Sequence, residues 1–373
     1  MKPYLSRLVL PLILILGFLA PGKVQASRGA PSSADFGYGV RVDLDGKQVL
    51  ESLPALSTLR VDWIGIDFNW SARWPDSQSQ PDLQILDQVM QFAQQANISV
   101  LLSITNAPAW ASTPQGPDPA MTAWFATNLA RRYPALRAIE LFPQANIRQA
   151  WGAIPDPGAY LNLLRGTRAA LRDANLDILL AAGGLAPLST HPDNGDLDDL
   201  TFLRGLYQTG GLDQTTVISL RLPELTGDPL QSPENSSPGE GQQHILRHYE
   251  EIRQVMLENH HASGILWITH FSGPSGKIHG GESATLEPQK QTLWLIQAYR
   301  LMRAQLYIGA AFYGQLNPSA HPEGETFSLI RSDSSRNPFF EVLGRLIAQN
   351  NQEFIGSPDF SEPQLKYIHK DRD

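Results

Sequence analysis

The sequence predicts a single-domain α/β protein with the (β/α)8 architecture of the TIM barrel. From residue 36 onward, short β-rich runs alternate with amphipathic stretches whose apolar residues recur at helical spacing. Eight β-rich runs follow one another, and eight parallel strands with intervening helices close this kind of barrel. A doubly wound open sheet is the alternative, but no glycine-rich dinucleotide fingerprint follows the first run.

The expected strands and helices alternate along the whole of this region. In chain order the strands cover residues 37–43, 59–68, 98–105, 136–142, 178–182, 216–221, 264–269 and 306–312. Several expected helices open with Asp, Pro or Ser caps. These helices cover residues 81–95, 121–133, 158–174, 199–207, 242–259 and 289–303. Long polar loops, 225–241 and 272–288, follow the sixth and seventh strands on the face where such barrels bind ligands.

The composition excludes several classes of function. Of the 373 residues, 42% are hydrophobic and 18% are charged, which is typical of a globular protein rather than a disordered one. The net charge of -8 and the lack of basic runs argue against nucleic acid, whose phosphates attract clustered Lys and Arg. The absence of cysteine excludes thiol chemistry, disulfides and zinc–thiolate sites.

The N-terminus has the pattern of a secretory signal peptide. Lys2 and Arg7 precede an apolar run over residues 8–20, and Val24-Gln25-Ala26 matches a cleavage site. We therefore expect a secreted or cell-envelope protein that has no membrane association after cleavage; an uncleaved anchor is the alternative. The expected organisation is a signal peptide at 1–26, a tether at 27–35, the barrel at 36–348 and a C-terminal tail at 349–373.

A series of short motifs runs through the chain in a specific order. They are FGYGVRVD, VDWIGIDFNWSARWP, NAPAWA, AIELFPQAN, AAGGLAPL, LWITHF, AAFYGQLN and FSLIRSDSSRNPFF. In order and spacing they resemble the retaining (β/α)8 glycoside hydrolases of the bacterial cellulase-family and β-xylosidase-like type, over residues 36–346. The resemblance implies sugar hydrolysis by two carboxylates that flank the glycosidic bond.

Both catalytic glutamates of the resembled family are replaced in this sequence. The family's fourth strand ends in Trp-Asn-Glu-Pro-Asn, and here Gln144 stands at the position of the Glu that acts as acid and base. The family's nucleophile is a Glu in a Thr-Glu-Phe context on the seventh strand, where this chain has His270. An amide cannot donate and later recover a proton, and imidazole is not this family's nucleophile.

Two supporting positions also depart from the family pattern. Gly65 stands where the second strand of the family usually carries an arginine, and Arg221 lies in Leu-Arg-Leu-Pro where a His-Pro-Tyr type motif is usual. Asp67 and Glu140 have inward parity but sit earlier along their strands, so a hydrogen-bonded place inside the barrel is favoured for them over catalysis. Glu224, just past the sixth strand, is the best-placed alternative acid, although an exposed loop carboxylate is favoured.

Several aromatic and polar residues at or beyond the strand ends are candidates for sugar binding. Aromatic rings stack on the C–H faces of sugars, while Asn and Arg side chains bind their hydroxyls. The candidates are Asn69, Trp70, Asn106, Trp110, Phe142, Asn146 and Arg221. The alternative is that these rings cap the barrel core, which we favour for Trp151. We expect Trp267 to be a core residue that packs against helices, because its parity is opposite to that of His270.

No cofactor or metal is expected. Residues 191–199 are rich in oxygen ligands, but they lack the Glu that completes an EF-hand loop, so Asp198 or Asp199 is expected to cap the following helix. The leading hypothesis is a degenerate glycoside hydrolase that binds an oligo- or polysaccharide. The alternatives are an active carbohydrate enzyme that uses non-standard residues, and a cell-envelope scaffold or interaction protein. The sequence gives no indication of the oligomeric state.

Overall fold

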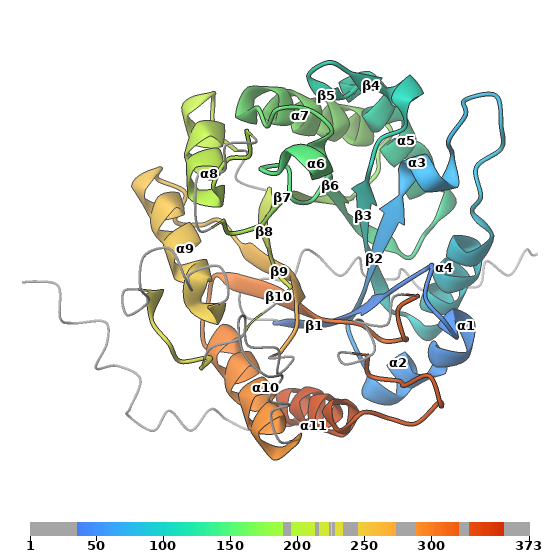
Figure 1. Ribbon diagram of the computed structural model, residues 1–373, viewed down its shortest axis with the longest axis vertical. Coiled ribbons are helices and arrows are strands. Elements are labelled where there is room, and N and C mark those ends of the chain that lie inside the picture. Colours follow the sequence, from blue (N-terminus) through green and yellow to red (C-terminus); the bar gives the residue numbers. More distant parts are fainter. Residues whose placement is uncertain are drawn as a thin grey trace, which may run out of the picture. The chain divides into compact units, whose positions relative to one another are not determined.

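The structure is a computed structural model that describes residues 36–188, 195–212, 216–223, 225, 228–233, 245–273, 288–320 and 328–353. Eight parallel strands close into a barrel in the order β1-β10-β9-β8-β7-β6-β3-β2, with helices on the outside (Figure 1). The predicted (β/α)8 fold is therefore confirmed.

The barrel strands correspond one to one with the predicted strands. They are β1 (Gly37–Val42), β2 (Trp63–Asn69), β3 (Ser99–Thr105), β6 (Leu136–Leu141), β7 (Leu179–Leu185), β8 (Val217–Leu222), β9 (Leu266–Phe271) and β10 (Ile308–Tyr313). The predicted start of the second strand at residue 59 is wrong, because residues 54–59 form helix α2 (Pro54–Leu59). Pro54 suits the first turn of this helix, and Leu56 and Leu59 bury its inner face.

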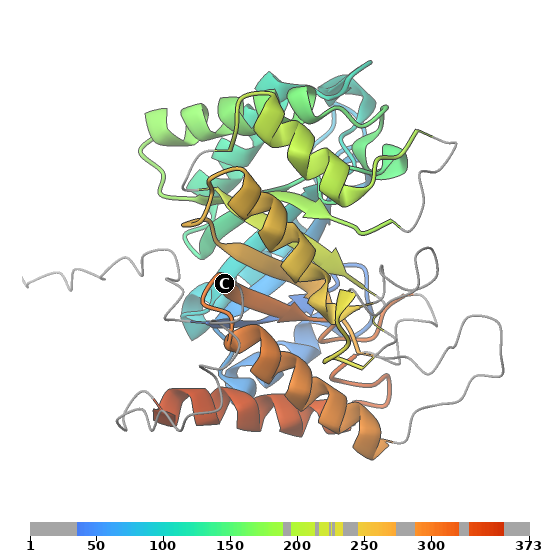
Figure 2. The same ribbon diagram turned by 90° about the vertical axis from the view of Figure 1, so that its left-hand side faces the viewer.

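The helices form a ring around the barrel, as both ribbon views show (Figure 2). The longer ones are α4 (Gln84–Ala96), α5 (Pro119–Arg132), α7 (Pro157–Asp173), α8 (Asp199–Gln208), α9 (Tyr249–Glu258), α10 (Pro288–Arg303) and α11 (Pro338–Glu353). The shorter ones besides α2 are α1 (Val49–Ser52), α3 (Trp70–Arg73) and α6 (Arg148–Trp151). Asp198 caps α8 by accepting a hydrogen bond from the Thr201 amide, as predicted. Helix α11 extends past residue 348, where the barrel was expected to end.

Two apolar cores hold the barrel together. The larger one lies between the strands and the helices, and the smaller one is drawn from side chains of the strands that point inward. The smaller core contains Trp63, Leu101, Ala138, Ala181, Val217, Trp267, Ala310 and Phe312. The prediction that Trp267 packs against helices is wrong: its ring lies 4.9 Å from that of Trp63, inside the barrel.

A β-bulge in β9 explains this error. Ile268 pairs with Leu220 of β8 and His270 with Arg221, so Thr269 has no register partner and β9 carries one extra residue. The pairing of β9 with β10 shows the same extra residue in β9, because Ala311 pairs with Ile268 and Tyr313 with Phe271. An inserted residue breaks the alternation of side chains along a strand, so Trp267 and His270 do not face opposite sides as simple parity predicts.

Candidate functional site

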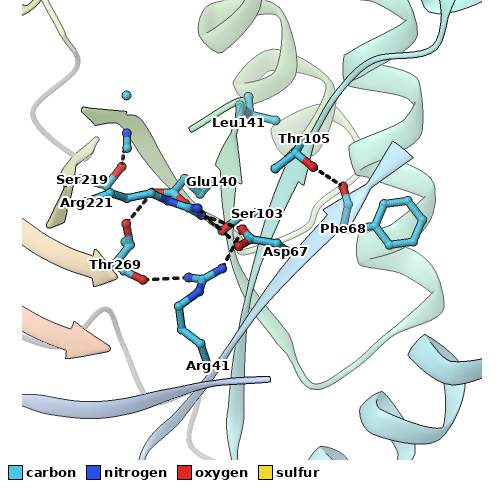
Figure 3. A network of polar contacts seen from close by, with 12 residues as sticks. Arg41, Asp67, Phe68, Ser103, Thr105, Glu140, Leu141, Ser219, Arg221 and Thr269 are labelled. Atoms are coloured by element: carbon cyan, nitrogen blue, oxygen red, sulfur yellow. Dashed lines mark hydrogen bonds and ion pairs between the residues drawn. The ribbon is translucent and has the colours of Figure 1, made fainter. Parts of the chain in front are cut away.

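Four charged side chains from four strands meet inside the C-terminal half of the barrel. They are Arg41 of β1, Asp67 of β2, Glu140 of β6 and Arg221 of β8 (Figure 3). In a parallel barrel the C-terminal ends of the strands form the face that carries ligand sites. These four groups therefore lie beneath the position where a ligand would enter.

Glu140 is the buried centre of this network. Its Oε2 accepts hydrogen bonds from Arg221 Nη2 at 2.6 Å and Ser103 Oγ at 2.7 Å, and its Oε1 accepts one from Thr269 Oγ1 at 2.7 Å. Burial alone would raise the pKa of Glu140, but the two guanidiniums and the two hydroxyl donors outweigh it and lower this pKa. The residue is thus an ionised carboxylate with its lone pairs occupied, which confirms the predicted place inside the barrel.

Asp67 belongs to the same network but is open to solvent. Its Oδ1 lies 2.6 Å from Arg41 Nη2 and 2.7 Å from Arg221 Nη2, yet 45% of its side chain is exposed. Its enclosure by the protein would raise its pKa, but the charges of Arg221 and Arg41 hold the pKa well below its usual range. Asp67 is therefore ionised, and it has no proton to give to a leaving group.

Arg41 fills the space that a side chain on the second strand would need. A Cβ placed on Gly65 would lie 3.1 Å from Arg41 Nη1. The first strand, not the second, therefore supplies the guanidinium at this point of the network. Arg41 Nη1 also donates to the Thr269 carbonyl at 2.7 Å, an oxygen in the β9 bulge. Sequence reasoning missed Arg41. The available signal was its position between Val40 and Val42, whose side chains face outward. An arginine between two outward-facing residues points into the barrel, where it needs a carboxylate partner.

His270 is partly exposed and pairs in register with Arg221. Burial, together with the positive charges of Arg41 and Arg221, lowers the pKa of His270 to about 3, against a smaller opposing effect of Asp67. The imidazole is therefore neutral at physiological pH. A neutral imidazole can donate or accept a hydrogen bond to a ligand, but it carries no charge to replace a carboxylate.

Gln144 lies in a loop that is fixed by the backbone of the next strand. Phe142 and Gln144 both have left-handed backbone conformations, with φ of 46° and 62°. The backbone N–H of Gln144 donates to the Gly184 carbonyl at 2.9 Å, and the backbone N–H of Ala145 donates to the Gly183 carbonyl at 3.4 Å. The Gln144 side chain is partly exposed. Its proposed equivalence to a catalytic acid remains a prediction.

Three predicted sugar-binding residues are wrong because they are buried. Trp70 stacks on Phe125 with ring centroids 4.2 Å apart, so it offers no face to a ligand. Phe142 is buried and lies edge-on to Trp151, which is itself buried as expected. The Asn146 side-chain amide donates to two backbone carbonyls, those of Ala186 and Leu197, each at 2.9 Å. Asn146 thus holds two loops together.

The remaining predicted sugar-binding residues have different environments. Arg221 forms ion pairs with Asp67 and Glu140, and its contact with a sugar remains a prediction. Asn69 Oδ1 caps helix α3 by accepting from the Ala72 amide at 3.1 Å. Asn106 is exposed, and half-buried Trp110 donates its indole N–H to the Trp74 carbonyl. These three remain candidates at the rim.

Some predicted features lie outside the described residues, namely the signal peptide, the tether, Glu224 and most of the loops that follow β8 and β9. Within the described ranges no helix is long and apolar enough to cross a membrane. The same ranges contain no group of three or more His, Asp or Glu side chains arranged to hold a metal ion.

The sequence matches no protein-family model and no curated protein. Solved structures do share the fold. A family 39 glycoside hydrolase from Bacteroides cellulosilyticus has a TM-score of 0.60 at 17% identity, covering 85% of this chain but 64% of its own. A β-xylosidase from Caulobacter crescentus has a TM-score of 0.56 at 13% identity, covering 86% and 69%.

A third similar structure is an endo-β-1,4-glucanase from Xanthomonas axonopodis pv. citri. It has a TM-score of 0.56 at 11% identity and covers 84% of this chain and 99% of its own. This chain therefore spans nearly the full length of the glucanase and less than two thirds of the family 39 enzyme. At these identities the likeness establishes the (β/α)8 barrel fold alone. Function has to be argued from the residues in the mouth of the barrel.

Proposed function

We propose that this protein binds a saccharide in the mouth of its barrel and does not hydrolyse it by the retaining mechanism. The glycoside-hydrolase-like fold supports a carbohydrate ligand, since the similar structures include a xylosidase and a glucanase. The mouth carries partly exposed polar side chains, namely Asp67, Asn106, Gln144 and His270, of the kinds that bind sugar hydroxyls.

The replacement of both glutamates, by Gln144 and His270, carries the proposal that hydrolysis is lost. Retaining hydrolysis needs one carboxyl group that is protonated before bond cleavage and a second carboxylate that attacks the sugar. The carboxyl groups described in the mouth, Asp67 and Glu140, both have lowered pKa values, so neither can serve as the acid near neutral pH. Neutral His270 does not supply the missing nucleophile.

The test combines a binding measurement with a sensitive activity assay on the purified protein. We expect calorimetry to detect binding of cellopentaose or xylopentaose, and we expect no turnover of aryl β-glucosides or β-xylosides. Turnover that is abolished by Gln144→Ala or His270→Ala would overturn the proposal. Turnover that survives both substitutions would favour the alternative of an active enzyme with other residues.

The structure offers specific support for the alternative of a cell-envelope scaffold or interaction protein. That hypothesis predicts that side chains fill the region of Trp70 and Trp110, and Trp70 is indeed packed against Phe125. Saccharide binding therefore depends on the polar mouth around Asp67. If no saccharide binds in the calorimetric panel, the scaffold function becomes the better explanation of the same barrel.

Export forms part of the proposal because it determines where the ligand is met. The pattern of residues 1–26 supports cleavage by a signal peptidase and a secreted or cell-envelope location. Mass spectrometry of the protein recovered from outside the cytoplasm tests this point. A mature chain that begins near residue 27 is the expected result, and an intact chain would indicate an anchor.

A further inference from the structure

We propose that Asp67 anchors the saccharide, accepting hydrogen bonds from neighbouring hydroxyls of a neutral sugar in the barrel mouth and disfavouring acidic sugars. This inference rests on the proposed function and specifies the residue and the class of ligand. It concerns a carboxylate on the second strand rather than the strand-end positions of Gln144 and His270.

Exposure separates Asp67 from the other charges of the network. Its side chain is 45% exposed, whereas those of Arg41, Arg221 and Glu140 are 5%, 8% and 0% exposed. A molecule that enters the mouth therefore meets the carboxylate, while both guanidiniums lie behind it. Among the described residues of the network, Asp67 is the only charged group that solvent reaches to this extent.

Asp67 is also held in one orientation. Two guanidiniums contact its Oδ1: Arg41 of the neighbouring strand β1 at 2.6 Å, and Arg221 of β8, across the barrel, at 2.7 Å. Among the described residues, its Oδ2 has only a long contact of 3.4 Å, with Arg221 Nη1. The Oδ2 oxygen can therefore accept hydrogen bonds from a ligand, and little conformational entropy is lost on binding because the side chain is already ordered.

The surroundings favour a neutral ligand. Within the described ranges, the charged and titratable groups around Asp67 are Arg41 from β1, Arg221 from β8, Glu140 from β6 and His270 from β9. The two positive charges are balanced by the two carboxylates, and the imidazole is neutral. Among the described residues, no open cation would compensate the carboxylate of a uronic acid beside the exposed Asp67, and like charges at short range repel.

Calorimetry on the full-length mature protein tests this inference with cellopentaose, xylopentaose and oligogalacturonate of the same length. We expect Asp67→Asn to weaken binding of the neutral sugar by about ten- to a hundredfold, since hydrogen bonds to a charged acceptor are the strong ones. Asp87→Asn is the matched control. Asp87 is similarly exposed and paired with an arginine, Arg132, but lies on the outer helix α4, so its substitution should leave the affinity unchanged.

Each outcome separates this inference from the proposed function. If the wild type binds a neutral pentasaccharide and Asp67→Asn binds it equally well, the role of Asp67 is wrong while the proposed function stands. If the wild type binds none of the sugars, the proposed function itself fails. Should Asp67→Asn not fold, the wild type still decides: we expect at least tenfold weaker binding of oligogalacturonate, and equal or tighter binding would overturn the inference.

Discussion

At the scale of single residues, the structure turns on how charges are accommodated in the barrel. Glu140 is buried completely and is tolerated because three donors, from Ser103, Thr269 and Arg221, satisfy its oxygens. Transfer of an unpaired carboxylate into such an environment would cost several kcal/mol. The pairing of two arginines with two carboxylates therefore keeps the network neutral without a protonated acid.

Glu140→Gln should destabilise the protein strongly. The amide keeps the shape of the side chain but leaves the charge of buried Arg221 only partly compensated, and breaking a buried pair typically costs about 3 to 5 kcal/mol. Urea denaturation gives the free energy of unfolding. Glu258→Gln is the control, because its pair with Arg204 is exposed and 3.8 Å long, and we expect a change below about 1 kcal/mol. Equal effects of the two substitutions would contradict the role given to Glu140.

At the scale of secondary-structure elements, irregularities in two strands position the mouth: in their pairing with β8, β7 has one extra residue between Ala182 and Leu185, and β9 has one at Thr269. The bulge in β9 turns the Thr269 carbonyl toward Arg41, and the glycine pair of β7 accepts the loop that carries Gln144. Gly184 has a φ of +47°, and a Cβ there would lie 2.5 Å from the Pro143 Cβ and 2.9 Å from Glu140 Oε1. Only glycine fits between these atoms in this conformation.

Gly184→Ala is therefore expected to destabilise the protein by about 3 kcal/mol or more, since it adds both a clash and a left-handed alanine. Thermal and urea unfolding measure the effect. Gly166→Ala is the matched control within helix α7, where a Cβ meets nothing within 4 Å. Alanine should be neutral there or stabilise by about 0.5 to 1 kcal/mol. A tolerated Gly184→Ala would mean that the Gln144 loop is not held as described.

His248 links helices α8 and α9 through a buried ion pair. Its Nε2 lies 2.5 Å from Asp199 Oδ2 and its Nδ1 lies 2.6 Å from Glu251 Oε2. Burial opposes protonation, but the two carboxylates prevail and raise the pKa of His248 to about 10. Because this pKa is raised on folding, the stabilisation is complete below the unfolded value of about 6.5 and is lost as the pH rises toward 10.

We therefore expect His248→Gln to cost a few kcal/mol at pH 6 and progressively less as the pH rises to 10. Urea denaturation of both proteins at pH 6, 8 and 10 measures the difference. His260→Gln on the surface is the control and should change the free energy of unfolding by less than about 0.5 kcal/mol throughout. A difference between wild type and His248→Gln that does not shrink with pH would contradict a charged imidazole.

Prediction from sequence succeeded for the elements and failed where local irregularities decide the outcome. Periodicity located every barrel strand, because a buried parallel strand needs a run of apolar residues. The bulge in β9 has no such signature in the sequence, so the predicted environment of Trp267 was wrong. Trp70 was misplaced because a strand end does not reveal whether helix α5 covers it, and Phe125 of α5 does. The ion pairs of Arg221 were not predicted, because its two carboxylate partners lie far away in sequence.

At the scale of the whole molecule, two groups of ion pairs limit the pH range of stability. The barrel network of Asp67 and Glu140 limits it in acid, and the ion pairs of His248 limit it in base. The lowered pKa values of Asp67 and Glu140 give stability that is complete above their unfolded values of about 4 and is lost as the pH falls toward the folded ones. The raised pKa of His248 gives stability that is lost above about 6.5. The free energy of unfolding should therefore be greatest between about pH 5 and 6.5.

The acid side of this profile can be assigned to the barrel network with the same variants. As the pH falls below about 4, Glu140 is protonated in the unfolded state but stays ionised in the folded state. The difference in the free energy of unfolding between wild type and Glu140→Gln should therefore shrink. Glu258→Gln is the reference: its pair with Arg204 is exposed, so the difference between wild type and Glu258→Gln should stay below about 1 kcal/mol down to pH 3. All eight tryptophans lie between residues 63 and 294, in the barrel domain. Tryptophan fluorescence during denaturation at pH 6, 5, 4 and 3 therefore reports the unfolding of this domain. If the difference between wild type and Glu140→Gln does not shrink as the pH falls, the network is not the main determinant of acid unfolding.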